Sequence, residues 1–439
     1  MAEQLVLEVP EAEETANASL PSPENTQDKA PLPAPPQAEA ASHLPENETK
    51  SLQELKHLLR RALLLHTLSI STPPPPPPQD SHNTQTIAMT LLEDVDGAKT
   101  LEAIEETIVP RAEEASVFGV KLLEDERSDV VLLKFLRARD FKPKDAFAML
   151  DSTLRWRKEF GVDNEEEEAE SDEFERAVFM RGRSKEGHPV CYNVYCEFRD
   201  GDEEKRRRFL RWRVRFMEKS VRELDFRHGG VSTIVQVNDL KNSPGPNRWE
   251  LIQALQLFQD NYPEFVAKQI FINVPWWYLA LNKMMSPFLT QRIKSKFVVA
   301  GPSKSTQALF KYISAEETPA QYGGLSKEGA FEAADSVTEI LVKPSSNHIV
   351  EFPVSKGCVV SWEARVVGWE VSYGAEFVPR DEDGYTIIIE KKRRIGGKEE
   401  QVVCSSYKVC DDGKLLLTFD NPTSKKKMLL YRFKTKLSG

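Results

Sequence analysis

Residues whose types could support catalysis are sparse in this sequence. His188 and Cys191 lie three positions apart at the predicted entry to a strand, a pairing that can supply a thiol nucleophile and a base. No third group that would orient the histidine is recognisable, and proximity in sequence alone is weak evidence for catalysis. The chain also contains no dinucleotide fingerprint, phosphate-binding glycine loop or nucleophile elbow. We therefore expect a protein that is not an enzyme.

Cysteine and histidine usage argues against a metal centre and against disulfides. The five cysteines are an odd number without a C-x-x-C pair, and the seven histidines are scattered. The chain begins with acidic residues rather than a basic region, and no apolar run approaches the roughly 18 residues of a membrane span. We expect a cytoplasmic protein with reduced thiols, no metal and no transmembrane helix.

Charge is unevenly distributed along the chain, although the net charge is −10. Residues 1–50 contain ten acidic and two basic residues, whereas residues 391–439 contain thirteen basic and five acidic residues. This uneven distribution of charge predicts an acidic, solvated tail at the N-terminal end. It also predicts a surface that binds anions near the C-terminal end. The basic clusters of that surface are Lys391, Lys392, Arg393 and Arg394, and Lys425, Lys426 and Lys427. Nucleic acid is the competing partner, but no nucleic-acid-binding motif accompanies the clusters.

Four regions follow one another along the sequence. Residues 1–110 are acidic and proline-rich, which predicts disorder. A helical periodicity at 51–65 is interpreted as a transient or partner-induced helix, with a weak membrane-surface helix as the alternative. Residues 111–165 predict a helical lead, residues 166–326 alternate strands and helices, and residues 330–439 contain short strands between turn residues. We expect a multidomain protein in which an α/β domain precedes an all-β sandwich.

The two main helices of the lead carry recognisable end signals. Ser128 can cap the first helix, because a serine hydroxyl accepts a hydrogen bond from a free backbone N–H of the first turn. Pro143 suits the first turn of the second helix, where the missing N–H costs nothing, and Gly161 suits the residue after its end. These signals place the helices without fixing what they pack against.

An apolar helix between positions 271 and 289 raises two alternatives. It concentrates large apolar and aromatic side chains, namely Trp276, Trp277, Tyr278, Met284, Met285, Phe288 and Leu289. Periodicity alone favours a core helix. The same residues suit a hydrophobic gate that opens into a bilayer, because Trp and Tyr favour the membrane interface and Met repacks easily.

Several motifs in this order resemble one family. The resemblance to the CRAL-TRIO lipid-binding family rests on "LLKFLRARDFKPKDAFAMLDSTLRWRKEFG" at 132–161, "FQDNYPE" at 258–264, the stretch 271–297 and "TPAQYGG" at 318–324. The β-sandwich that follows resembles a GOLD domain. With the acidic, proline-rich N-terminus, the combination is similar to the plant patellin family over about residues 115–439.

The resemblance implies a bowl with a sheet floor, helical walls and a mobile gate formed by the apolar helix. It also implies a headgroup site made by Arg139, Glu264 and Lys296, where cations would bind phosphate and the carboxylate would accept from an inositol ring. A structural Arg–Glu salt bridge is the alternative. The ligand would be a phospholipid, phosphatidylinositol or a phosphoinositide, and no other cofactor is expected.

The chain departs from the family pattern at several headgroup positions. The serine and threonine that hold phosphocholine in the transfer proteins correspond here to Ile234 and Gln236. A threonine and an acidic residue of the inositol site correspond to Ile293 and Ser184. Phosphatidylcholine exchange is therefore not expected, the inositol site is incomplete, and another hydrophobic ligand stays an alternative.

We expect a peripheral membrane lipid-binding or transfer protein that binds phosphoinositides in a gated pocket and docks on anionic membranes. By the resemblance, it would act in membrane trafficking at the forming cell plate during cell division, with trafficking proteins as partners and no nucleic acid. One alternative is a lipid-filled interaction scaffold whose GOLD domain recruits cargo. Another is an enzyme that acts on lipid, which would turn over a supplied phosphoinositide.

Overall fold

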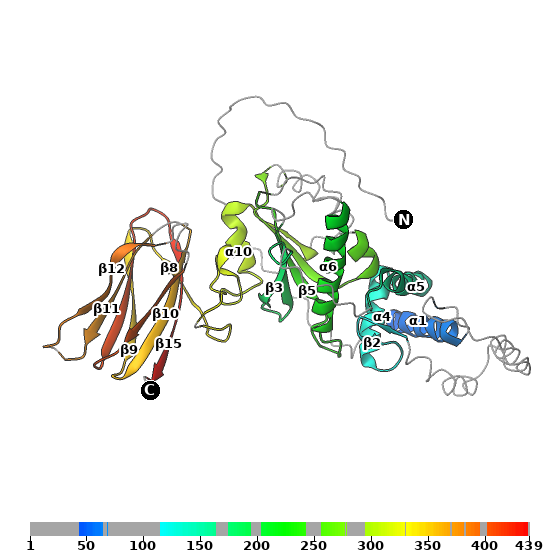
Figure 1. The fold of residues 1–439 in the computed structure, drawn as a ribbon, viewed down its shortest axis with the longest axis horizontal. Helices are drawn as coiled ribbons and strands as arrows, with labels where there is room; N and C mark the ends of the chain where they lie inside the picture. Colours follow the sequence, from blue (N-terminus) through cyan, green and yellow to red (C-terminus); the bar gives the residue numbers. More distant parts are fainter. Residues whose placement is uncertain are drawn as a thin grey trace, which may run out of the picture. The chain divides into compact units, whose positions relative to one another are not determined.

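The computed structural model of the protein describes residues 44–64, 68, 115–163, 174–194, 203–242, 256–276, 278, 295–329, 331–368, 371–381, 383–395 and 402–437. Most of the predicted acidic tail lies outside these residues. Helices come first along the described chain, a five-stranded sheet follows, and two four-stranded sheets come last (Figure 1). This order confirms the expected succession of helical lead, α/β domain and β-sandwich.

The helical lead has the predicted helices, but one helix cap differs from the prediction. Its elements after the first helix are β1 (Ser116–Val117), β2 (Val120–Lys121), α4 (Glu126–Ala138) and α5 (Pro143–Phe160). Pro143 begins α5, and Gly161 follows its end with a φ of 73°, as predicted. Asp125 rather than Ser128 caps α4, because Asp125 has the extended backbone and accepts from the N–H of Arg127, whereas Ser128 is already helical.

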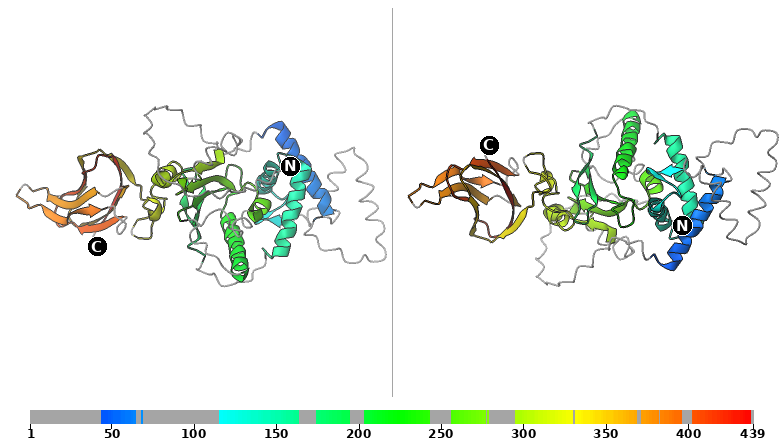
Figure 2. Two further views of the ribbon diagram at one scale, coloured as in Figure 1. Left: turned by 90° about the horizontal axis from the view of Figure 1, so that it is seen from above. Right: turned by 90° about the horizontal axis from the view of Figure 1, so that it is seen from below.

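Helix α1 (Glu46–Leu64) corrects the expectation of a transient helix in the N-terminal region. The helix buries four leucines at helical spacing, Leu52, Leu55, Leu59 and Leu63. It packs against α4 and α5, and it lies beside α4 in both views of Figure 2. Lys56 forms an ion pair with Asp129 of α4. The apolar face of α1 is thus covered by the chain itself.

A five-stranded sheet forms the floor of the α/β domain, in the order β3-β4-β5-β6-β7. The strands are β3 (Val178–Arg183), β4 (Pro189–Val194), β5 (Ile234–Asp239), β6 (Val266–Ile272) and β7 (Phe297–Val299). The edge strand β3 is antiparallel to β4, and the other neighbouring pairs are parallel. Helix α6 (Glu203–Arg222) lies between β4 and β5 in the chain. The parallel pairs confirm the expected βαβ arrangement.

The two faces of this sheet enter different cores. Val190 and Tyr192 of β4 pack with residues of the segment that comes after β7. This segment contains η4 (Pro302–Lys304), α10 (Ser305–Leu309) and η5 (Ala320–Tyr322). The intervening Cys191 packs on the opposite face, with Met217 and Val221 of α6. The face with Cys191 is therefore the one that α6 covers.

The C-terminal domain is a β-sandwich of two antiparallel sheets, in the orders β13-β10-β15-β8 and β12-β11-β14-β9. The strands are β8 (Thr338–Val342), β9 (Ser346–Val354), β10 (Cys358–Val367), β11 (Val371–Pro379), β12 (Ile387–Ile395), β13 (Val403–Lys408), β14 (Gly413–Asn421) and β15 (Lys427–Leu437). Trp362 of one sheet donates to the hydroxyl of Tyr373 in the other at 2.8 Å, and both side chains are fully buried. The interior is thus shared by the two sheets.

Candidate functional site

A large cavity lies between α6, β3 and the segment 319–328. Its volume is about 1670 Å³. Pockets for drug-sized ligands are smaller, at roughly 300–1000 Å³. The ends of β5 and β6 contribute Asp239 and Asn273 to its lining. The cavity is therefore large enough for a ligand well above drug size.

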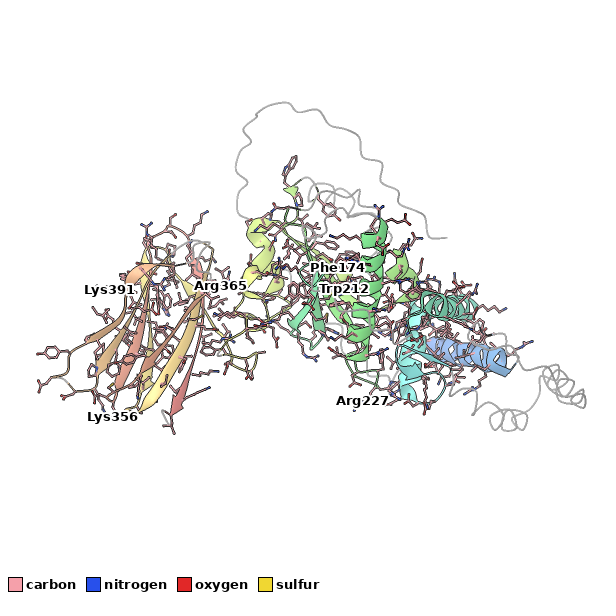
Figure 3. All side chains as sticks on the ribbon, viewed as in Figure 1. Phe174, Trp212, Arg227, Lys356, Arg365 and Lys391 are labelled. Atoms are coloured by element: carbon pink, nitrogen blue, oxygen red, sulfur yellow. The ribbon has the colours of Figure 1, made fainter. Side chains whose placement is uncertain are left out.

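One wall of the cavity is aromatic. Phe174, Trp212 and Phe216 line it together with Val178 and Met180 of β3. The ring centroids of Phe174 and Trp212 are 5.5 Å apart, and those of Trp212 and Phe216 are 5.3 Å apart. Figure 3 labels Phe174 and Trp212, whose side chains lie next to each other beside α6. This wall presents a continuous apolar surface to a ligand.

Charged side chains complete the lining, and cations outnumber carboxylates among the described lining residues. The cations are Arg176, Arg181, Arg208, Arg215, Lys219, Lys241 and Lys327. The carboxylates are Glu175, Glu223, Asp239 and Glu328. An apolar wall combined with an excess of positive charge suits an amphiphilic anion.

The structure brings together two of the three predicted headgroup residues. The Nζ of Lys296 lies 2.6 Å from Oε2 of Glu264. Arg139 follows the last residue of α4, and its Nη1 donates to the carbonyl oxygen of Ala138 at 3.0 Å. None of the three is among the described lining residues of the cavity. The Lys296–Glu264 pair is thus a separate polar site on the same domain.

Lys134 positions Glu264 and was missed by the sequence reasoning. It is 2% exposed, and its Nζ donates to the carbonyl oxygens of Ser232 at 2.8 Å and Glu264 at 3.1 Å. Glu264 has a φ of 53°, a left-handed conformation that is uncommon outside glycine. The buried ammonium therefore ties α4 to the backbone that presents the Glu264 carboxylate. Its place in "LLKFLRAR", on the buried face of a predicted helix, was the available signal.

Only the start of the predicted gate lies within the described residues. Trp276 is 80% exposed, and Tyr278 is half-buried with its N–H donating to the carbonyl oxygen of Pro275. The other predicted gate residues, Trp277, Met284, Met285, Phe288 and Leu289, lie outside the described residues. The choice between gate and core helix stays a prediction for that segment.

A buried ionic network joins the lead to α6. Arg157 of α5 is 3% exposed and donates to both carboxylate oxygens of Glu218, at 2.7 and 3.1 Å. Tyr262 donates to Glu218 Oε1 at 2.6 Å, and Asp163 accepts from Arg157. Burial lowers the pKa of Arg157, but the hydrogen bonds and negative charge of Glu218 more than offset this and raise the pKa overall. Every charge in this network therefore has a partner of opposite sign.

The two predicted basic clusters of the sandwich lie near one end of it. Arg394 lies opposite Ser372 in β11, and Ser372 lies opposite Asp420 near the end of β14. The predicted clusters 391–394 and 425–427 therefore approach the same end of the sandwich. Lys391, Lys392, Arg393, Arg394, Lys425 and Lys426 are exposed, and Lys392 forms an ion pair with Asp420. Lys427 is 4% exposed, and burial lowers its pKa, so it is not presented to a membrane surface.

His188 and Cys191 make no catalytic pair within the described chain. Nδ1 of His188 lies 3.0 Å from the hydroxyl and 3.2 Å from the carbonyl oxygen of Thr233, and Cys191 is buried on the α6 face.

Across the described ranges, no cluster of His, Cys, Asp and Glu could hold a metal ion. The helices in the described ranges are each too short or too polar for a transmembrane span.

Family models match three parts of the chain. They are a CRAL/TRIO N-terminal domain over residues 91–152, a CRAL/TRIO domain over residues 173–324 and a Patellin-1-like C-terminal GOLD domain over residues 343–427. The fold and these matches define a protein with a CRAL/TRIO domain followed by a GOLD domain.

Relatives then identify the family. Patellin-3 of Arabidopsis thaliana is 50% identical over 90% of this chain and 76% of its own length. Patellin-5 of the same plant is 59% identical over 73% of this chain, and the match spans about half (51%) of its own length. The chain belongs to the patellin family. It is also 29% identical to the phosphatidylinositol transfer protein SFH5 of Kluyveromyces lactis, over 51% of this chain and 80% of that protein.

Proposed function

We propose that this protein binds a phospholipid, phosphatidylinositol or a phosphoinositide, in the cavity beside α6 and transfers it between membranes. The observation that carries the proposal is the cavity itself, with its aromatic wall and its excess of cations. Each CH₂ group exposed to water costs ~0.8 kcal/mol, so a lipid leaves a bilayer only for a site that buries its chains nearly as well. A relative named as a phosphatidylinositol transfer protein, which matches half of the chain, supports the same function.

The headgroup site in this proposal is the Lys296–Glu264 pair. The ammonium of Lys296 would bind an inositol phosphate and the Glu264 carboxylate would accept from ring hydroxyls. Arg139 would join them only after its guanidinium leaves the carbonyl oxygen of Ala138. Trp276, exposed at the start of the proposed gate, would insert at the membrane interface when the gate opens.

Membrane docking in this proposal uses the exposed basic residues of the sandwich, without Lys427. Each cation near an anionic surface contributes about 1 kcal/mol, and the contribution falls with salt. The cluster 391–394 and the turn with Lys425 and Lys426 approach one end of the sandwich, so they can face one membrane together. Docking of this kind would be reversible and would need no anchor.

The test is transfer of labelled phosphatidylinositol between two populations of liposomes. Wild-type protein should transfer the lipid, and Lys296→Ala should lower the rate about tenfold, because it removes a charge-assisted hydrogen bond. Lys144→Ala, which removes an exposed lysine of α5, should transfer at the wild-type rate. An unchanged rate in Lys296→Ala would remove the headgroup assignment. No transfer by wild type, with tight liposome binding, would favour the lipid-filled scaffold.

The cellular part of the proposal rests on the family resemblance alone. We propose peripheral association with membranes of the forming cell plate and a role in trafficking during cell division. Fluorescently tagged full-length protein should mark the cell plate in dividing cells. Neutralising Lys391, Lys392, Arg393 and Arg394 together should lower that signal, and an unchanged signal would exclude these residues as the docking site.

A further inference from the structure

One buried cation of the α/β domain has no anionic partner in the part of the chain that the structure describes. Arg213, in the middle of α6, is 6% exposed. Its Nη1 is fully buried and has no hydrogen-bond partner among the described residues, where it also makes no ion pair. An arginine stays protonated in proteins, so this is a buried charge without a carboxylate partner among the described residues.

The surroundings of Arg213 hold its guanidinium in a fixed place. Its central carbon lies 5.3 Å from the ring centroid of Phe216 and 4.8 Å from that of Phe258. Cys191 of β4 also lies beside it: burial raises the pKa of this thiol, and the positive charge of Arg213 acts in the opposite direction. Tyr262 lies within range of its charge, but the Tyr262 hydroxyl donates to Glu218. The aromatic faces attract the cation without neutralising it.

Arg213 borders the cavity wall. Phe216 and Ser220, three and seven positions further along α6, both line the cavity. Residues at this spacing lie on one side of a helix, and side chains of a helix lean toward its N-terminus. The guanidinium therefore lies over Cys191 of the sheet and behind the ring of Phe216, one side chain away from the described lining.

We propose that Arg213 binds the anionic group of a lipid held in this cavity, an oxyanion such as a phosphodiester or a carboxylate. This inference rests on the proposed lipid-binding function and adds an inner anion subsite to it. The subsite is separate from the Lys296–Glu264 pair, which is not among the described lining residues. The planar guanidinium can donate two parallel hydrogen bonds to such an oxyanion.

The nearby sheet residues favour an anion over a zwitterionic headgroup as the ligand. Ile234 is fully buried in the core, and Gln236 lies opposite Cys191 in the parallel register of β4 and β5. Neither of these two side chains carries a negative charge that could pair with the cation of a zwitterion. Arg213 is a buried cation on this face without a carboxylate partner among the described residues, so a net negative ligand would gain there by pairing with it.

The test uses the full-length chain and follows lipid uptake from vesicles by native mass spectrometry. The vesicles contain phosphatidylglycerol, oleate or diacylglycerol, which present a phosphodiester, a carboxylate and no charge. Arg213→Met should lower uptake of the phosphodiester or the carboxylate lipid about 10- to 100-fold and leave diacylglycerol within twofold. Arg213→Lys keeps the positive charge but cannot donate two parallel hydrogen bonds. Its uptake of the anionic lipid should lie between that of Arg213→Met and that of wild type. Arg211→Met, an exposed arginine of the same helix, should behave as wild type.

Thermal unfolding separates a ligand role from a structural one. If Arg213 serves a ligand, lipid-free Arg213→Met should unfold at the wild-type temperature or above, because a buried unpaired charge has been removed. Its stabilisation by phosphatidylglycerol should be lost. A lower unfolding temperature with parallel loss of all three lipids would overturn the proposal, as would unchanged uptake of both anionic lipids.

Failure of the proposed function gives a different result. Wild-type protein that takes up none of the three lipids would contradict lipid binding in the cavity, and the subsite would fall with it. Wild-type protein that takes up diacylglycerol and both anionic lipids equally, with no effect of Arg213→Met, would leave the lipid-binding function standing and remove only the anion subsite. A loss confined to oleate would assign the carboxylate as the anion, and a loss confined to phosphatidylglycerol would assign the phosphodiester.

Discussion

Two buried arginines at helix α6 differ in whether a carboxylate lies beside them. Arg157 reaches α6 from α5 and is fully paired with Glu218, which Tyr262 also binds. Arg213 belongs to α6 itself, lies between two phenylalanine rings and has no described carboxylate partner. Both are more than nine-tenths buried. The difference teaches that burial of a charge does not define its role, whereas the presence or absence of its counter-charge does.

Removing the paired arginine should produce the largest effect. Arg157→Met leaves Glu218 buried without its cation, and breaking a buried pair in this way costs about 3–5 kcal/mol. Urea unfolding of the full chain, followed by near-ultraviolet circular dichroism, should show a clearly lower midpoint. A decrease in the free energy of unfolding below about 1 kcal/mol would mean that the Arg157–Glu218 pair does not stabilise the fold. It would contradict the distinction between the paired and the unpaired arginine.

Lys134→Met should have the next largest effect on stability. The substitution removes both hydrogen bonds from the ammonium to the carbonyl oxygens of Ser232 and Glu264, and hydrogen bonds to charged groups contribute about 1.5–3 kcal/mol. The same urea titration measures the change. Phosphatidylinositol transfer should also fall, because Glu264 loses the support of its backbone. Wild-type transfer in a destabilised Lys134→Met protein would separate Glu264 from headgroup binding.

A substitution of the exposed partner in the network should have a small effect. The Asp163 side chain is 65% exposed, so its ion pair with Arg157 is screened by water. Asp163→Asn should therefore cost less than about 1 kcal/mol in the same unfolding measurement. A cost comparable to that of Arg157→Met would show that the network depends on Asp163 as much as on Glu218.

The smallest expected effect concerns the Cys191 thiol. The positive charge of Arg213 favours the thiolate, so Arg213→Met should raise the pKa of Cys191 above its already raised value. At a fixed alkaline pH, a smaller fraction of thiolate means slower reaction with a thiol reagent. The rate of Cys191 labelling, measured against pH in wild type and variant, should shift to higher pH. A shift to lower pH would place Arg213 away from the thiol.

Local signals in the sequence predicted much of the fold. Pro143 and Gly161 mark the ends of α5 because each acts through its own backbone. The cap of α4 was assigned to Ser128 instead of Asp125, since both can accept from a first-turn N–H and only the backbone conformation decides between them. The packing of α1 could not be predicted, because its leucines find their partners in helices far along the chain.

The candidate site was predictable only in part. A family motif pointed to Glu264 and Lys296, and the structure pairs them. Lys427 was grouped with its exposed neighbours, although the register of β15 with β8 places it in a buried position. The place of Arg213 could not be read from "FLRWRVRF", where it is one of several arginines, because only tertiary contacts show that it is buried without a described carboxylate partner.

Native mass spectrometry of the full-length protein after incubation with phosphatidylinositol-containing vesicles tests lipid binding most directly. Wild-type protein should gain the mass of one phosphatidylinositol molecule per chain and should release it again to acceptor vesicles, because the proposed function requires reversible burial of the lipid chains in the cavity. Protein that binds the vesicle surface but is recovered without any lipid would contradict a lipid-binding cavity.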